Sequence, residues 1–364
     1  MVDVKDSGKN GVVMEIRDIA DAIRWQANHA EEAGAPATTR VIRAQLAMIE
    51  NEETATARRL ANWHGPAVQD AVPLRIAGGL HHLLLSDTDR ALEPVYAGLT
   101  TDQGTVDEIV CDLAATYDNL LLPWLDTPPQ TNEAGRAASI MAGLAWLTER
   151  LGKRFRLYEL GASAGINTMM DRFRYDLGGV QYGAPGSPVV VEPEWRGDAP
   201  PSGDVEIDSV FGCDLKPIDL TDPEQALRLK AYVWPEATER MARIDAAIRL
   251  AKEQPPLVAR QSAGQFVTEL LTEEQDSGVC RTLFHSIVWQ YLSDYEQGVI
   301  TEALEEAGRS ATREKPLAWV RLETNRETFR HELTVRYWDG EAGDGSPHLL
   351  AEAHPHGAWV NWLQ

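Results

Sequence analysis

The chain has 364 residues, of which 43% are hydrophobic and 25% are charged, a composition typical of a globular protein with about two domains. Its net charge of −22 argues against a nucleic-acid partner and against an anionic membrane surface, because both attract clustered Lys and Arg residues. A small molecule or a protein is therefore the expected partner, and we favour a small-molecule substrate. The sequence leaves the oligomeric state open.

The cysteines and the start of the chain bear on location. Three cysteines are present, widely spaced and without a C-x-x-C motif: Cys111, Cys213 and Cys280. This pattern fits a reducing cytosol and indicates neither a disulfide framework nor a zinc knuckle. Residues Met1 to Gly11 are polar, unlike a signal peptide, and no apolar run is long enough to span a bilayer. Adjacent histidines such as His81 and His82 cannot easily hold one metal on a helix. We expect a cytoplasmic protein without a metal site.

Residues 1–150 are expected to form a helical N-terminal domain. One apolar helical face consists of Ile16, Ile19, Ile23 and Ala27. The last helix of this domain is expected over Asn132 to Leu151, with Gly152 where a left-handed C-terminal residue belongs. We expect this domain to cover or shape a substrate pocket and to contact the acceptor.

After Gly152, short apolar runs alternate with amphipathic segments, a pattern typical of βαβ units and a parallel sheet. The expected strands are Arg156–Leu160, Ser209–Cys213, Leu257–Arg260, Thr282–Ile287 and Leu317–Leu322. Two alternating runs, Glu332–Trp338 and Leu349–His354, predict a terminal antiparallel pair at the sheet edge. The sequence thus predicts an α/β domain over residues 151–364.

Two further features belong to this domain. An insertion at about residues 175–208, rich in Gly, Pro and Trp, interrupts the βαβ pattern, and we interpret Val189–Val191 as a hairpin strand within it. Capping sequences at Ser293–Glu296 and Thr221–Glu224 predict the starts of two helices.

The segment Phe155 to Asn167, F-R-L-Y-E-L-G-A-S-A-G-I-N, is the most informative for function. An apolar run ends near Glu159 and is followed by small residues at Gly161, Ser163 and Gly165. Such residues at a strand-to-helix turn allow a tight bend and let a ligand approach main-chain N–H groups. The segment predicts the floor of a nucleotide-type pocket.

The order of elements after residue 150 resembles the Rossmann-like fold of class I S-adenosylmethionine-dependent methyltransferases. The segment E-L-G-A-S-A-G-I-N looks like the first motif of that superfamily, with Ser163 where many members carry a second glycine. Nearly the whole chain also resembles an uncharacterised bacterial family, domain of unknown function 2332. The shared segments are E-L-G-A-S-A-G, V-F-G-C-D-L-K-P-I-D, V-W-P-E and F-H-S-I-V-W-Q-Y-L. The second resemblance implies the fold but supplies no reaction.

The methyltransferase resemblance implies S-adenosylmethionine as the cofactor. It places the methionine part of the cofactor against residues of the first motif: Gly161, Ala162, Ser163, Gly165 and Asn167. Glu159 would lie close to the cationic end, where a carboxylate is electrostatically favourable. Asp214 would hold the ribose hydroxyls at the end of the second strand, with Glu192 as a rival.

The resemblance also assigns residues at the later strands. Gln261 and Ser262 stand where that superfamily commonly has an acid that reads the adenine, and both side chains can hydrogen-bond an exocyclic amine. His285 and Ser286 end the fourth strand and would face the transferring methyl. Methyl transfer depends largely on alignment, and a base is needed only when the nucleophile starts out protonated. His285 is the first candidate base and Glu323, ending the fifth strand, is the second.

Each assignment has an alternative. The glycines can serve only packing, Asp214 can cap backbone N–H groups, and His285 can be a buried histidine with satisfied hydrogen bonds.

Residues 161–165 also read G-x-S-x-G, which would make Ser163 the nucleophile of a serine hydrolase with His354 or His356 as base. A dinucleotide-binding G-x-G-x-x-G is not present. A non-catalytic binding protein on the same scaffold is the third possibility. We favour methyl transfer to a small-molecule acceptor.

Overall fold

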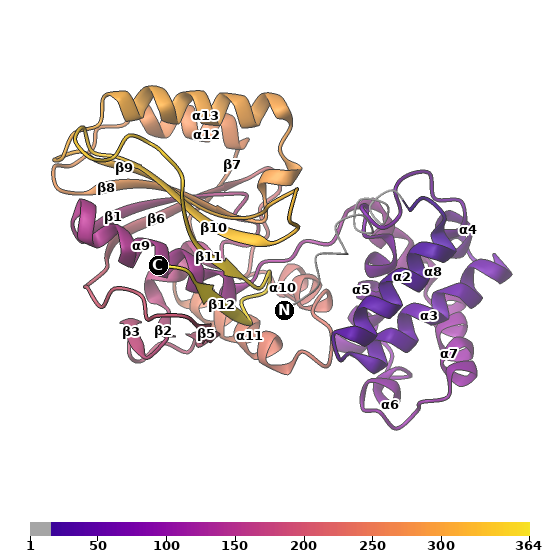
Figure 1. Ribbon diagram of the computed structural model, residues 1–364. Coiled ribbons are helices and arrows are strands. Elements are labelled where there is room, and N and C mark those ends of the chain that lie inside the picture. Colours follow the sequence, from indigo (N-terminus) through magenta and orange to yellow (C-terminus); the bar gives the residue numbers. More distant parts are fainter. Residues whose placement is uncertain (1–15) are drawn as a thin grey trace. The chain divides into compact units, whose positions relative to one another are not determined.

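The computed structural model describes residues 16–364, so the polar segment Met1 to Gly11 lies outside the described residues. The chain divides into two compact units (Figure 1). Among the described residues, unit 1 comprises residues 16–131 and Asp222–Ala242, and unit 2 comprises Asn132–Thr221 and Arg243–Gln364. This division differs from the predicted domains of residues 1–150 and 151–364. Residues 132–150 belong to unit 2, and residues 222–242 belong to unit 1.

Unit 1 is helical throughout the part that the structure describes. Its helices are α2 (Ile19–Glu32), α3 (Pro36–Asn51), α4 (Ala55–Ala61), α5 (Val72–Leu85), α6 (Glu93–Tyr96), α7 (Gln103–Thr116), α8 (Asp118–Leu121), η1 (Leu122–Asp126) and α10 (Pro223–Ala231). The side chain of Asp18 caps α2 by accepting from the Asp21 N–H group. Apolar residues at helical spacing, such as Ile23 and Ile76, are fully buried in one core.

Unit 2 contains a nine-stranded sheet in the order β5-β12-β11-β10-β9-β8-β1-β6-β7. Its strands are β1 (Arg154–Leu160), β5 (Glu194–Arg196), β6 (Glu206–Asp214), β7 (Val258–Arg260), β8 (Cys280–Ser286), β9 (Leu317–Thr324), β10 (His331–Trp338), β11 (His348–Ala353) and β12 (Trp359–Trp362). Strands β7, β6, β1, β8 and β9 run parallel, and β9 to β12 form antiparallel pairs. The protein is therefore a mixed α/β protein with a large, mostly parallel sheet.

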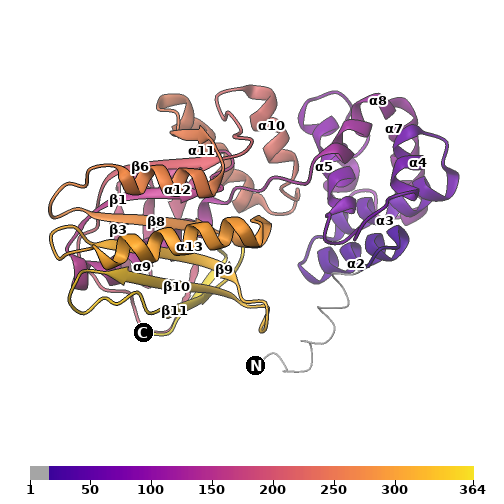
Figure 2. The same ribbon diagram turned by 90° about the horizontal axis from the view of Figure 1, so that it is seen from above.

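Helices cover both faces of this sheet (Figures 1 and 2). Helix α9 (Ala137–Leu151) packs on one face, where a Cβ added to Gly143 would lie 3.2 Å from Val320. Helices α12 (Ala263–Thr272) and α13 (Asp294–Arg309) pack on the other face, with Leu317 and Trp319. The alternation along β9 places odd-numbered and even-numbered residues on opposite faces.

Both predicted capping sequences begin helices. The Asp222 side chain accepts from Glu224 N–H at 2.9 Å at the start of α10, and Ser293 accepts from Glu296 N–H at 3.2 Å at the start of α13. The other helices within the described residues are α11 (Thr238–Glu253), which contains the boundary between the units, and the 3₁₀ helices η2 (Ala134–Arg136), η3 (Asn167–Arg172) and η4 (Trp289–Tyr291).

The insertion differs from its prediction. Strand β4 (Val190–Val191) pairs in parallel with β2 (Arg174–Leu177), so the interpretation of Val189–Val191 as a hairpin strand was wrong. The hairpin partner of β2 is β3 (Val180–Gly183), and the three strands form a separate small sheet. The terminal antiparallel pair is present as β10 and β11, but β12 and then β5 extend the sheet beyond it.

Candidate functional site

The strand order reverses between β1 and β8, because the chain continues from β1 to β6 on one side and later returns to β8 on the other. In open α/β sheets, ligands bind outside the carboxyl ends of the strands at such a reversal. Gly161, Asp214, Gln261 and Ser286 all lie at or just beyond the carboxyl ends of parallel strands. The predicted binding residues thus lie along the same edge of the sheet.

The bend after β1 contains three residues with positive φ: Gly161 (φ 62°), Ser163 (φ 53°) and Gly165 (φ 70°). A side chain at Gly161 would clash with Val288, and a Cβ at Gly165 would lie 2.7 Å from Pro256. Both glycines are therefore required by backbone geometry and by close packing. Ala162 is fully buried, and its N–H group donates to the Cys213 carbonyl at 2.9 Å.

A cavity of about 180 Å³ lies beside this bend. Its lining residues are Gly161, Cys213, Asp214, Leu215, Gln261, Ala263, Val288, Tyr291, Leu292 and Glu296. They come from the ends of β1, β6 and β7, from the segment after β8, and from α12 and α13. The volume is below the roughly 300–1,000 Å³ of typical small-molecule sites. Val288, which packs on Gly161, is one of the side chains that limits it.

Asp214 has a structural role in addition to facing the cavity. Its Oδ2 accepts from Ser163 N–H at 2.9 Å and its Oδ1 accepts from Lys216 N–H at 2.8 Å. These bonds match the capping alternative, but a carboxylate has about four acceptor positions and can accept further bonds. The rival acid Glu192 instead pairs with Arg174 at 2.8 Å and does not line the cavity.

Gln261 and Ser262 connect β7 to α12. The Gln261 amide nitrogen donates to Glu269 at 2.7 Å, and its backbone N–H donates to the Asp214 carbonyl at 3.0 Å. Ser262 is the N-cap of α12, where its hydroxyl accepts from Gln265 N–H at 3.4 Å. Gln261 therefore lines the cavity, whereas Ser262 shapes the helix behind it.

A group of buried polar atoms without hydrogen-bond partners lies at the same bend. Within the described residues, Glu159 Oε2, Ser163 Oγ and both amide atoms of Asn167 form no hydrogen bond of good geometry, although the Asn167 amide lies close enough to Glu159 to lower its pKa. Glu159 is 2% exposed and Asn167 is 1% exposed. Each unsatisfied buried polar group costs about 1–3 kcal/mol, so such groups are uncommon in structural cores and are expected where a ligand completes them.

Burial raises the pKa of Glu159 to about 8. The nearby Asn167 amide and Arg136 guanidinium favour the ionised carboxylate, while the negative charge of Asp214 opposes it. Glu159 is therefore mostly protonated at neutral pH in the free protein. A cation placed beside it would favour its ionisation.

His285 and Glu323 form a buried pair. Glu323 Oε1 lies 2.6 Å from His285 Nδ1, and Trp319 Nε1–H donates to His285 Nε2 at 3.0 Å. Nε2 accepts, so the proton of a neutral His285 lies on Nδ1 and is donated to Glu323. Burial lowers the pKa of His285, although Glu323 opposes this. Neither ring nitrogen is free to take a proton. The arrangement therefore matches a buried histidine with satisfied hydrogen bonds, which was the alternative to His285 as the catalytic base.

Glu323 also fixes the segment that follows β8. Its Oε1 accepts from Val288 N–H at 3.0 Å. Burial raises its pKa, but the hydrogen bonds from His285 and from backbone N–H groups outweigh burial, so the pKa lies below its usual value. The same segment contains Ile287 at φ 53°, an unfavourable conformation for a β-branched residue. Glu323 thus holds a strained turn in place.

The geometry around Ser163 does not provide a hydrolase triad. Its hydroxyl has no hydrogen-bond partner, and therefore no histidine base, among the described residues. His354 and His356 follow β11, where the backbone N–H of His354 bonds to the Trp359 carbonyl. The bend resembles a nucleophile elbow only in its positive φ.

The sequence reasoning missed Arg136. This residue is 6% exposed, donates from Nε to the Pro355 carbonyl at 2.8 Å, and donates from Nη1 to the Ser286 carbonyl at 3.4 Å. It lies just before α9, the helix that precedes β1. A helix that leads into a strand begins near the carboxyl edge of a parallel sheet, so the start of α9 could have been placed near the site from the order of elements. The predicted domain boundary at residue 150 instead assigned this helix to the N-terminal domain.

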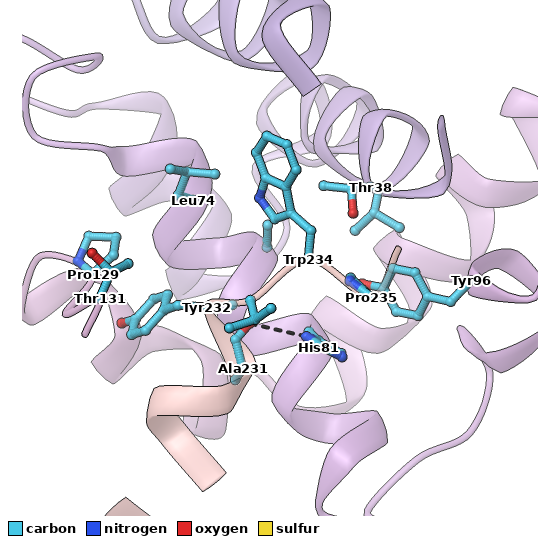
Figure 3. A pocket seen from close by; sticks show the side chains of 14 residues that line it. Thr38, Leu74, His81, Tyr96, Pro129, Thr131, Ala231, Tyr232, Trp234 and Pro235 are labelled. Carbon is cyan, nitrogen blue, oxygen red and sulfur yellow. Dashed lines mark hydrogen bonds between the residues drawn. The ribbon is translucent and has the colours of Figure 1, made fainter. Parts of the chain in front are cut away.

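The V-W-P-E segment, by contrast, lies in unit 1. Trp234 and Pro235 line a small cavity with Tyr96 and His81, whose Nδ1 lies 3.1 Å from the Ala231 carbonyl (Figure 3). The cavity volume is about 40 Å³, which is space for only a few water molecules. Burial lowers the pKa of His81 to about 4, so the ring is neutral near pH 7. This segment is a packing element of the helical unit.

These features define a class: an α/β protein whose large, mostly parallel sheet carries a cavity and unsatisfied polar groups at its carboxyl edge. The chain belongs to the family described as "Uncharacterized protein conserved in bacteria (DUF2332)", which it matches over residues 20–362. A search of curated proteins and a search of solved structures each found no match. Among the described residues, no helix has the length and apolar character needed to cross a membrane.

Proposed function

We propose that this protein binds S-adenosylmethionine at the carboxyl edge of the sheet and transfers its methyl group to a small-molecule acceptor. The observation that carries the proposal is the group of unsatisfied buried atoms on Glu159, Ser163 and Asn167 at the glycine bend. These atoms can accept and donate hydrogen bonds, and one of them belongs to a carboxyl group whose charge a cation would stabilise.

The residues fit the chemistry of this cofactor. S-adenosylmethionine carries a sulfonium and an ammonium cation and, when bound, supplies an activated methyl group. Asp214 offers a carboxylate at the bend, and the Glu159 carboxyl would ionise beside a bound cation. The cavity beside Gly161 continues to Asp214, Leu215 and Gln261, where the adenosine part would lie. The chain's own contribution is to hold the sulfonium in line with the acceptor.

The strand order also supports the proposal. The parallel strands, numbered by their appearance in the chain, have the order 3-2-1-4-5 in β7, β6, β1, β8 and β9. This is the order of doubly wound nucleotide-binding sheets, whose ligand site adjoins the first strand. The Rossmann-like methyltransferase fold that the sequence resembles belongs to this type.

The proposal requires the segment after β8 to move. The present cavity of about 180 Å³ is smaller than a typical small-molecule site. Val288 packs directly on Gly161, and the preceding Ile287 is held at φ 53°. Strained residues at a site often belong to a part that changes on binding. Displacement of Val288 would enlarge the cavity and relieve Ile287.

Calorimetric titration with S-adenosylmethionine and its demethylated product tests the proposal. We expect binding to the wild type and at least about tenfold weaker binding to Glu159→Gln, because a charge-assisted contact contributes about 1.5–3 kcal/mol. Glu274→Gln, which changes an exposed carboxylate of unit 2, is the matched control and should bind normally. No binding of either compound to the folded wild type at millimolar concentration would refute the proposal. Gly161 is unsuitable for this test because its substitution would itself disturb folding.

A further inference from the structure

A second groove lies on the α13 face of the sheet in unit 2. Its volume is about 470 Å³, and it is lined by Trp289, Asp294, Gln297, Gly298, Thr301, Glu302, Trp319, Arg321 and Arg336. None of these residues lines the cavity at Gly161. The groove is bounded by the first half of α13, by β9 and β10, and by the 3₁₀ helix after β8. Its size falls within the range of small-molecule sites.

Arg321 is the unusual residue of this groove. Within the described chain its guanidinium forms no hydrogen bond and no ion pair, and its Nε atom is buried without a partner. The guanidinium lies 5.0 Å from the ring centroid of Trp289 and 4.7 Å from that of Trp319. Stacking on aromatic rings stabilises the cation but leaves its five N–H donors unsatisfied. Only water or a ligand can complete them.

Arg336 gives an internal comparison, because it lines the same groove and is fully engaged. Its Nη2 donates to Glu305 at 3.0 Å and its Nε donates to the Gly345 carbonyl. Within the described structure, Arg336 is therefore hydrogen-bonded and Arg321 is not. Burial lowers the pKa of Arg321, Glu323 opposes this shift, and Arg336 adds to it. An anion bound in the groove would replace the lost hydration of Arg321.

The surroundings indicate which anion fits. Trp289 is half-buried and offers an apolar surface beside the cation. Asp294 and Glu302 also line the groove and form no ion pair with Arg321 in the described structure. Their negative charge disfavours a ligand with several charges, such as a phosphate dianion. A single carboxylate matches the planar fork of an arginine and carries one charge.

We propose that this groove binds an organic monocarboxylate with a flat apolar body, its carboxylate on Arg321 and its body against Trp289. The site is separate from the cavity at Gly161, so it stands whether or not an adenosyl compound binds there. The groove has open space at Gly298 for the body of the ligand, because a Cβ added to this residue would have no atom within 4 Å.

Benzoate is the probe, and benzamide is its uncharged counterpart of the same shape. We expect benzoate to bind the full-length wild-type protein with millimolar affinity in calorimetry, and added salt to weaken that binding. Benzamide should bind at least about tenfold more weakly, because a hydrogen bond to a charged group is stronger than one to a neutral group. Arg321→Gln should lose benzoate binding by at least about tenfold.

Arg313→Gln is the matched control, because Arg313 is an exposed arginine that pairs with Glu341 and lies outside the groove lining. It should bind benzoate as the wild type does. If Arg321→Gln does not fold, Arg321→Lys keeps the charge but not the fork, and it should show weaker benzoate binding with an unchanged midpoint of thermal unfolding. The inference is overturned if the wild type does not bind benzoate, if it binds benzamide equally well, or if the folded Arg321 variant binds benzoate as tightly as the wild type.

Discussion

The Glu159 carboxyl illustrates how a single residue can link stability to pH. Its pKa is raised from 4.5 to about 8 in the folded protein. Between these values the folded state holds a proton that the unfolded state has released. The unfolding free energy therefore falls as the pH rises through this window, and the stabilisation by the bound proton is lost above about pH 8.

This linkage gives a testable difference between the wild type and Glu159→Gln. Relative to the variant, whose amide does not titrate, the wild type should lose up to about 1.4 kcal/mol of unfolding free energy per pH unit between about pH 5 and 8. Urea denaturation of both proteins across this range measures it. Stabilities that change in parallel for the two proteins would show that Glu159 is not buried as described.

At this scale the sequence identified positions better than partners. The methyltransferase resemblance assigned residues to the ends of β1, β6 and β7, and these residues share one edge because the strands are parallel. The hydrogen bonds of His285 could not be predicted, because its ring nitrogens bond to Trp319 and Glu323, which lie 34 and 38 residues further along the chain. Arg321 was missed for the same reason, since an unpaired cation is recognisable only from what surrounds it.

Single elements were predictable where the chain is buried on both faces. The central parallel strands β1, β8 and β9 contain short apolar runs, because they are covered on both faces, whereas β6 and β7 are more exposed. Strands β5 and β12 were not expected. They are short, half-exposed, and paired with each other across more than 150 residues of sequence. Local composition carries no signal for such pairing.

The V-W-P-E segment provides a prediction at the scale of an element. Glu236 accepts from Ala37 N–H at 2.8 Å, from Thr38 N–H at 2.9 Å and from the Thr38 hydroxyl at 2.7 Å. Helix α3 has no side-chain N-cap of its own. Glu236, which lies 199 residues after Ala37 in the sequence, accepts hydrogen bonds from the free N–H groups at the start of α3 instead.

Glu236→Gln should therefore destabilise unit 1 by about 1–3 kcal/mol, because it removes the charge from hydrogen bonds to a helix N-terminus. Chemical denaturation measures the change. Glu108→Gln, at an exposed position on α7, is the control and should stay within about 0.5 kcal/mol of the wild type. Equal stability of both variants would mean that water caps α3 as well as Glu236 does.

At the scale of the whole molecule, the division into units could not be read from the sequence order. The chain leaves unit 2 after Thr221, contributes residues 222–242 to unit 1, and returns at Arg243. The hydrophobic pattern changes near residue 150 from helical spacing to short apolar runs. This change marks the start of β1, and the sequence analysis interpreted it as a domain boundary. The compact units instead divide before α9, because that helix covers a face of the sheet.

Each unit contains its own hydrophobic core, and this predicts two unfolding transitions in calorimetry. Leu80 is fully buried in the core of unit 1, and Leu304 is fully buried in a core of unit 2. Either Leu→Ala change should cost about 2–5 kcal/mol and lower a midpoint by about 2–4 °C per kcal/mol. We expect Leu80→Ala to lower one midpoint and Leu304→Ala to lower the other. A single transition that both variants shift equally would mean that the units unfold together, since separate cores give separate transitions only when neither unit depends on the other for its stability.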